Sequence, residues 1–96
     1  MTRSDTLRLL QQHKAHLVRE FGLSRLALFG STARDMARAD SDVDILVAFD
    51  GPATSRRYFG VQFYLEDLLG RPVDLVSEKA LRPELRAAIE MEAVSV

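Results

Sequence analysis

The segment Phe29–Val47, with the sequence FGSTARDMARADSDVDILV, contains two motifs that follow one another closely. Gly30 and Ser31 end an apolar run, and after ten intervening residues Asp42 and Asp44 open a second apolar run. Alternate residues of a strand point to the same face, so these two aspartates project together, with Cα atoms about 6.5–7 Å apart. Apolar residues would be less costly at the start of a buried strand, so the pair indicates a functional site.

The aspartate pair has the chemistry of a metal site. Two converging carboxylates repel each other unless a cation lies between them or water screens them. The chain has no cysteine, and neither histidine is near the pair in sequence. Oxygen ligands alone suit a hard divalent ion such as Mg²⁺ or Mn²⁺, which usually completes its shell with water and substrate phosphates. The alternative is a solvated strand start in which Ser41 and Asp42 form a turn.

The Gly-Ser pair has the chemistry of a phosphate site. A strand that ends in Gly30 and is followed by Ser31 at a helix start presents free backbone N–H groups and a hydroxyl to an anion. Glycine lets the anion approach the backbone closely because it has no Cβ. Arg34, one turn further on, either adds a positive charge to this site or lies on the helix surface. For Gly30 and Ser31 alone, the alternative is a simple strand-to-helix turn with a serine cap.

Hydrophobic periodicity predicts alternating helices and strands around the two motifs. The predicted helices cover residues 4–22, 31–37, 55–70 and 81–93, and the predicted strands cover 24–30, 42–49, 72–77 and 93–96. This interleaving predicts an α/β or α+β domain in which helices flank a small mixed β-sheet. The length of 96 residues suits one domain over residues 1–96.

Several details of these elements follow from local signals. Ser4 or Asp5 is expected to cap the first helix, and Gly22 to end it. The residues predicted to face the core are Leu7, Leu10, Leu17, Val18 and Phe21 of the first helix, Tyr58, Val61, Leu65 and Leu68 of the third, and Leu85 and Ile89 of the fourth. His13 and His16 are predicted on the surface. Arg56, Arg57 and Arg71 are interpreted as solvated or partner-facing.

The aromatic side chains of the third helix have two interpretations. Tyr58, Phe59, Phe63 and Tyr64 occur at helical spacing, which more often marks core residues than a platform for stacking bases. Some of them are candidates for contact with a partner, because the helix is apolar around much of its circumference.

A third acid occurs in the predicted strand PVDLVS. If this strand lies beside the Asp42–Asp44 strand, Asp74 points to the face opposite Val73 and Leu75. Asp74 is then available as a third metal ligand or as a base for an attacking hydroxyl. Two metal ions held about 3.5–4 Å apart by such carboxylates stabilise an in-line phosphoryl displacement. The alternative is an exposed acid on an edge strand.

These residues carry a family resemblance. The pattern G-S, ten residues, D-x-D resembles the signature of the DNA polymerase β-like nucleotidyltransferase superfamily, and the whole chain is similar to its minimal (MNT) members. The resemblance implies that Gly30 and Ser31 hold the nucleoside triphosphate. It also implies that Asp42, Asp44 and Asp74 form the catalytic and metal-binding set, with two Mg²⁺ ions and ATP as substrate.

Minimal members typically pair with a HEPN toxin, which implies a role as the antitoxin. The expected reaction is transfer of AMP from ATP to a hydroxyl, such as that of a HEPN tyrosine, within a hetero-oligomer. Two alternatives stay open: an antitoxin that neutralises its partner by binding alone, and the catalytic subunit of a small-molecule nucleotidyltransferase.

One residue departs from the family pattern. The family often has G-S-x-A-R-G, and GSTARD places Asp35 at the last glycine. Aspartate tolerates the left-handed backbone conformation better than most residues, so the turn can persist. Its negative charge near the phosphates is expected to disfavour nucleotide binding, which keeps the binding-only alternative open.

Composition excludes other classes of function. The net charge is −1, so the chain lacks a basic surface for gripping phosphates, and direct nucleic-acid binding is not expected. The N-terminal residues 1–14 are polar without the apolar core of a signal peptide, and no run of residues approaches the length of a membrane span. A cytoplasmic protein without membrane contact is therefore expected.

Overall fold

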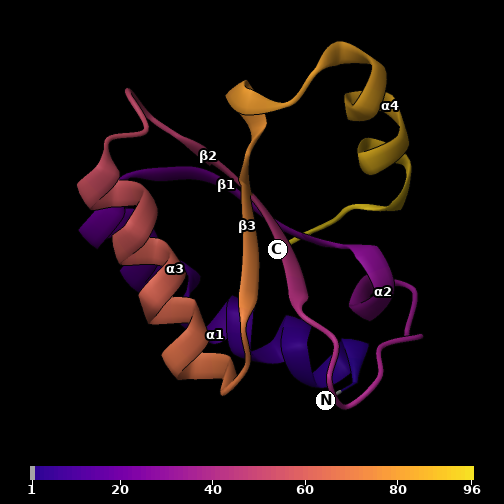
Figure 1. Cartoon of the computed structure of the whole chain (residues 1–96). Coiled ribbons are helices and arrows are strands. Elements are labelled where there is room, and N and C mark those ends of the chain that lie inside the picture. The colour runs from indigo at the N-terminus through magenta and orange to yellow at the C-terminus, as the bar shows by residue number, and fades with distance from the viewer. Residues whose placement is uncertain (1) are drawn as a thin grey trace.

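A computed structural model describes residues 2–96 and contains a four-stranded sheet with helices on both faces (Figure 1). The elements in chain order are α1 (Arg3–Phe21), β1 (Leu23–Phe29), α2 (Gly30–Ala33), β2 (Val43–Phe49), α3 (Ser55–Leu69), β3 (Val73–Ser77), the 3₁₀ helix η1 (Glu78–Ala80), α4 (Pro83–Glu92) and β4 (Val94–Ser95). The predicted alternation of helices and strands is thus confirmed.

The sheet is mixed, as predicted, with the strand order β3-β2-β1-β4. The central strand β1 is antiparallel to both β2 and β4. The strands β2 and β3 are parallel, so the chain must cross back between them, and α3 makes this crossover. The topology therefore brings the starts of β2 and β3 to the same end of the sheet.

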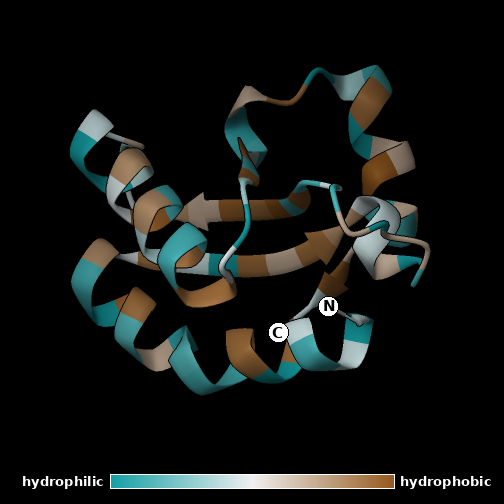
Figure 2. Cartoon of the chain, turned by 60° about the horizontal axis from the view of Figure 1, so that its bottom comes forward, coloured by the Kyte–Doolittle hydropathy of each residue, from teal (hydrophilic) through white to brown (hydrophobic). Residues whose placement is uncertain are grey.

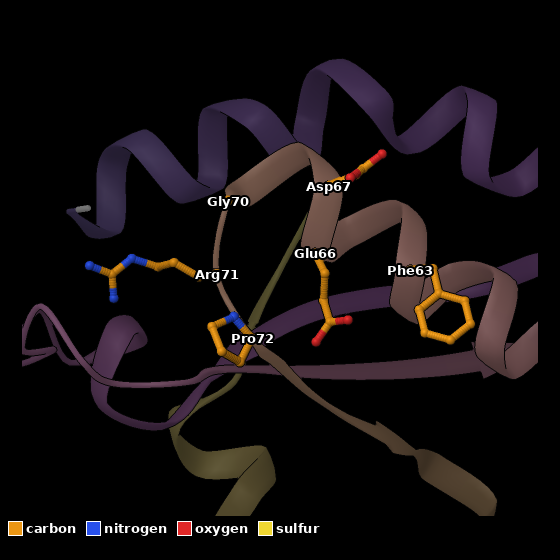
Figure 3. A pocket seen from close by; sticks show the side chains of 6 residues that line it. All are labelled: Phe63, Glu66, Asp67, Gly70, Arg71 and Pro72. Atoms are coloured by element: carbon orange, nitrogen blue, oxygen red, sulfur yellow. The ribbon is translucent and has the colours of Figure 1, made fainter.

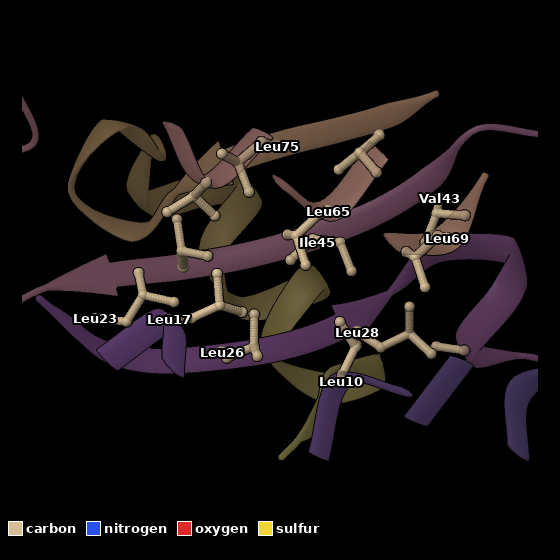
Figure 4. Close-up of a cluster of buried hydrophobic side chains, with 14 of the residues drawn as sticks. Leu10, Leu17, Leu23, Leu26, Leu28, Val43, Ile45, Leu65, Leu69 and Leu75 are labelled. Atoms are coloured by element: carbon tan, nitrogen blue, oxygen red, sulfur yellow. The ribbon is translucent and has the colours of Figure 1, made fainter. Parts of the chain in front are cut away.

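The main core lies between the sheet and the helices α1 and α3, which cover one face together (Figure 2). Figure 4 shows how the leucines of both helices meet the strands there, with Leu10, Leu17 and Leu65 fully buried. A smaller cluster of Ala27, Phe29 and Leu46 lies on the opposite face, where Ile89 of α4 packs against it. Because side chains alternate along a strand, Asp44 points to this second face, as Leu46 does.

Two expectations about the inward faces were wrong. Val18 is 39% exposed, because it lies about 100° around the helix from the fully buried Leu17 and falls outside the buried stripe. Leu85 is 52% exposed. Within Pro83–Glu92, no residue of α4 is buried, because this helix contacts the sheet only through its C-terminal half.

The ends of the elements differ from the expectations in small ways. Thr2, rather than Ser4 or Asp5, caps α1 by accepting a hydrogen bond from the N–H of Asp5. Gly22 ends α1 in the left-handed conformation, as expected. The helix after β1 is shorter than the predicted 31–37, because Asp35 takes a φ of 58° and stops it. Over residues 2–96, no helix is both long and apolar enough to cross a membrane.

Candidate active site

The structure brings the three predicted acids to one end of the β2–β3 pair. Asp44 and Asp74 are direct partners in the parallel register. Asp42 precedes β2 by one residue. Asp42 and Asp74 are exposed, whereas Asp44 is half-buried. The neighbour relation on which the Asp74 expectation depends is therefore present, and we call these three residues the acid cluster.

Asp44 has the most perturbed ionisation in the acid cluster. Burial, together with the neighbouring Asp74, raises the pKa of Asp44 from the ordinary 3.8 to about 6. The charges of Asp42 and Glu92 add to the effect. Desolvation and like charges both disfavour the ionised carboxylate. A group of carboxylates in this condition is stabilised by a cation.

The three carboxylates of the acid cluster have the oxygen chemistry that suits a hard divalent ion. Among residues 2–96, no group of three or more His, Cys, Asp or Glu side chains is close enough together to hold a metal ion. Asp44 and Asp74 are instead direct neighbours in the register, and Asp74 raises the pKa of Asp44. Carboxylate oxygens are the ligands that Mg²⁺ prefers, and a bound cation would offset the repulsion between the two carboxylates.

Gly30 connects the two motifs physically. It has a φ of +73°, and a Cβ at this position would lie 2.0 Å from Oδ2 of Asp44. Only glycine satisfies both conditions, because other residues are strained at positive φ and carry the Cβ that would overlap the carboxylate. Phe29, the preceding residue, pairs with Asp44 in the β1–β2 register. The Gly-Ser turn and the aspartate pair therefore form one continuous surface.

Gly30, Ser31 and Arg34 are the residues predicted to bind phosphate, and we call them the phosphate-binding turn. This turn is contacted by a residue that the sequence did not suggest. Glu92 Oε1 accepts a hydrogen bond from Gly30 N–H at 3.1 Å, and Glu92 Oε2 accepts one from Arg34 Nη1 at 2.6 Å. Ser31 is half-buried at the start of α2. No local pattern marks Glu92, because its contact depends on α4 folding back over the sheet.

Asp35 lies where the family often has glycine, and its side chain is occupied elsewhere. Within residues 2–96 it is the only non-glycine residue with a positive φ, which agrees with the expected tolerance of aspartate. Its Oδ1 accepts a hydrogen bond at 3.1 Å from Arg3 N–H, in the first turn of α1. The N-terminal end of a helix stabilises negative charge. The Asp35 charge is therefore compensated by α1.

The stability of the turn should depend on which residue replaces Asp35. Alanine is expected to lower the free energy of unfolding by about 1–2 kcal/mol, because it is strained at positive φ and cannot accept the hydrogen bond of Arg3. Glycine is expected to change it by less than about 1 kcal/mol, because relief of strain offsets the lost bond. Urea denaturation measures both, with Asp40→Ala in the same loop as the control. Equal losses for alanine and glycine would contradict the backbone argument.

Arg71 has a structural role near the acid cluster. Its Nη1 donates hydrogen bonds to the carbonyl oxygens of Arg38 and Ser41, at 3.2 and 3.1 Å. Arg71 therefore holds the loop that leads into Asp42, a role that the expected solvated or partner-facing position did not include. Figure 3 shows Arg71 extending away from Phe63 at the rim of a shallow hollow. This hollow is lined by Phe63, Glu66, Asp67, Gly70, Arg71 and Pro72, and the acid cluster lies outside it.

The aromatic residues of α3 divide into two groups. Tyr64 is half-buried, hydrogen-bonded to Nδ1 of His13 at 2.6 Å and stacked on His16. His13 is consequently half-buried rather than a simple surface residue, whereas His16 is exposed as predicted. Phe59 and Phe63 are 49% and 64% exposed, and their rings stack with centroids 6.2 Å apart. Tyr64 therefore supports the fold, and the two phenylalanines form an apolar surface.

The site and fold define a class of protein. The family model described as the nucleotidyltransferase domain matches residues 10–96, so the chain belongs to this family. Its mixed four-stranded sheet with flanking helices is the polymerase β-like nucleotidyltransferase fold, which confirms the expected fold class.

The similarity to particular proteins places the chain among the minimal nucleotidyltransferases. A solved structure assigned as a minimal nucleotidyltransferase is 41% identical with a TM-score of 0.85, and the match covers 100% of this chain and 97% of that one. The protein adenylyltransferase MntA of Thermococcus cleftensis is 36% identical over 96 residues, covering 100% of this chain and 97% of the relative.

A more distant likeness concerns a complex. The structure of a tri-AMPylated Shewanella oneidensis HEPN toxin with its MNT antitoxin matches with 21% identity and a TM-score of 0.66. The match covers 92% of this chain and 69% of that one. At this identity the likeness shows a shared fold.

Proposed function

We propose that this nucleotidyltransferase transfers AMP from ATP to a hydroxyl group of a protein partner and releases pyrophosphate. The observation that carries the proposal is the contact of two motifs: Gly30, the start of the phosphate-binding turn, lies directly against Asp44 of the acid cluster. Phosphates on the turn would then lie beside the carboxylates. In the reaction the acceptor oxygen forms a bond to the α-phosphorus, and the bond from this phosphorus to pyrophosphate breaks.

The residues of the acid cluster have different environments that suit different roles. Asp42 and Asp44, one before and one at the second position of β2, would hold Mg²⁺, two ions in the full site. Bound divalent ions supply charge neutralisation and alignment of the attacking and leaving oxygens. Asp74 is exposed and is next to Asp44, so it is placed to accept the proton of the acceptor hydroxyl. Gly30 N–H, Ser31 and Arg34 would bind the triphosphate.

The partner that we propose is a HEPN toxin, which the chain would silence as its antitoxin. The relative MntA is named as a protein adenylyltransferase, and the S. oneidensis complex contains an AMPylated HEPN toxin. On this chain the exposed pair Phe59 and Phe63 offers an apolar surface of the kind that protein interfaces use. A tyrosine hydroxyl of the toxin is the proposed acceptor. The cytoplasm, where ATP is available, is the proposed site of the reaction.

The proposal is tested by weighing the partner. The chain is incubated with ATP, Mg²⁺ and the protein encoded by the neighbouring gene, and mass spectrometry of that partner should show added adenylate. EDTA, or Asp42→Ala in the chain, should abolish the added mass, while the two proteins still co-elute in gel filtration. Replacing the acceptor tyrosine with phenylalanine should do the same. A silenced toxin with unchanged mass would overturn the enzymatic proposal.

A binding-only antitoxin is the second candidate, and Glu92 is the observation that favours it. A carboxylate on Gly30 N–H and Arg34 occupies the groups that would otherwise hold phosphate. Asp35, in contrast, gives little support to this candidate, because its charge is compensated at α1. The two candidates differ in whether Asp42→Ala still silences the toxin in cells: the binding-only antitoxin predicts that it does.

A further inference from the structure

We infer that Glu92 is an internal competitor of the triphosphate: its carboxylate occupies the phosphate-binding turn, and nucleotide binding displaces it together with the C-terminal end of α4. The inference rests on the proposed function, because it assigns a determinant of nucleotide affinity to the same site.

The first argument is the chemical likeness between the Glu92 contact and a bound phosphate. One oxygen of the carboxylate accepts from the Gly30 amide, and the other accepts from the Arg34 guanidinium. A phosphate group would use two of its oxygens on the same two donors. The Gly30 amide has a single N–H, so a carboxylate and a phosphate exclude each other there.

The second argument is that the last turn of α4 can release Glu92 while Val94 and Val96, which follow it, keep their packing against the main core. The main core lies on the opposite face of the sheet, between the strands and the helices α1 and α3. Within Pro83–Glu92 no side chain is buried, and only Ala27 and Leu28 of β1 pair with β4. Segments with few buried contacts open locally at low free-energy cost. The Glu92 end of α4 meets this description.

The third argument concerns what else holds α4 in place. Arg25 of β1 bonds to Glu90 at 2.6 Å and to Glu78 of η1 at 3.3 Å, and Arg86 of α4 also pairs with Glu78. These ion pairs are partly exposed. The Arg86–Glu78 pair anchors the part of α4 before its last turn, whereas Glu90 lies in the last turn itself. Movement of the last turn, with loss of the Arg25–Glu90 pair, can therefore free Gly30 and Arg34 while the earlier part of α4 stays attached.

The first test compares nucleotide affinity in matched variants. Calorimetric titration with MgATP is carried out on the wild type, Glu92→Gln and Glu90→Gln. Glu92→Gln is expected to bind MgATP roughly tenfold more tightly, because the triphosphate no longer competes with a charged side chain for the phosphate-binding turn. Glu90→Gln is on the same helix and loses an ion pair with Arg25, but leaves the turn untouched. It is expected to bind within about twofold of the wild type.

The second test follows displacement in the wild-type chain and needs no variant. Ala93 N–H donates to the carbonyl of Ile89, and Val96 N–H donates to that of Leu26. Saturation with MgATP should accelerate hydrogen exchange at Ala93, because the end of α4 moves, while Val96, which packs against the main core, and the amides of α1 stay protected. Exchange at Ala93 that is unchanged or slower in the bound state would overturn the inference.

The outcomes separate this inference from the proposed function. If Glu92→Gln binds MgATP as the wild type does, or more weakly, Glu92 is not a competitor, and the inference fails while the proposed function stands. If neither variant nor the wild type binds MgATP, the proposed function fails and the inference fails with it. Tighter binding by Glu92→Gln alone, with faster exchange at Ala93, supports both.

Discussion

Replacing Gly30 with alanine is expected to lower the free energy of unfolding by about 2–4 kcal/mol and to abolish nucleotide binding. The loss has two sources. The backbone has a φ of +73°, where a residue with a Cβ is strained, and the new Cβ would lie 2.0 Å from Asp44 Oδ2 and 2.7 Å from its Cγ. The Asp44 side chain must then move away from the position that suits the acid cluster.

Gly70→Ala is the matched control for this substitution. Gly70 ends α3 with a φ of +65°, and among the described residues no heavy atom lies within 4 Å of the place where its Cβ would be. It therefore reproduces the backbone strain without the overlap, and its expected cost is about 1–2 kcal/mol. The difference between the two variants in urea denaturation measures the Asp44 contact. If both variants lose the same stability, that contact carries no cost and the argument for glycine at position 30 reduces to backbone strain.

Asp44→Asn is expected to reduce AMP transfer roughly 100-fold or more, because the amide cannot supply the charge that a divalent ion requires at the centre of the acid cluster. Initial rates of adenylate incorporation into the partner measure this loss. Asp67→Asn, which removes an exposed carboxylate on α3, serves as the control and should transfer at the wild-type rate. A similar loss in both variants would show that Asp44 has no special role.

The same substitution should stabilise the metal-free chain at neutral and alkaline pH. The pKa of Asp44 is about 6 in the folded chain against an ordinary 3.8, so the folded state holds the proton more tightly than the unfolded state. Protonation of Asp44 therefore stabilises the folded state. This stabilisation is complete below pH 3.8 and is lost as the pH rises through 6. The full shift corresponds to at most about 3 kcal/mol, and solvent screening at this half-buried group reduces it to about 1–2 kcal/mol.

The pH dependence of urea denaturation tests the sign of this effect. Above pH 7, Asp44→Asn should be more stable than the wild type by about 1–2 kcal/mol, and below pH 4 the two should be equal. Adding Mg²⁺ at pH 7.5 should raise the stability of the wild type but not that of the variant. A wild type that is more stable than the variant at pH 8 without metal would contradict the raised pKa.

The central part of the fold was predictable because its signals are local. Gly30-Ser31 and the Asp42–Asp44 pair each occur within a few residues and at the end of an apolar run, so their elements could be assigned from alternation and turn chemistry. Asp74 required one further assumption, that β3 lies beside β2. The α3 crossover between two short apolar strands made this the simplest topology.

The remaining features depend on contacts between distant residues. Glu92 reaches Gly30 only because α4 folds over the second face of the sheet, 62 positions away in sequence. Asp35 was expected to adopt the left-handed conformation, but its partner Arg3, 32 positions away, has no sequence signal. Leu85 was predicted to be buried from helical spacing, and it is exposed because periodicity indicates an apolar face without showing whether anything covers it.

The exposure of α4 has an evolutionary consequence. No residue within Pro83–Glu92 is buried. Variants with a mutation in this helix should therefore rarely fall below the stability threshold at which selection removes most core variants. Glu92 can therefore drift to other residues at little cost to the fold, whereas Gly30 and Asp44 are constrained by each other. Related chains would then be able to diverge in nucleotide affinity through this one helix while the acid cluster stays the same.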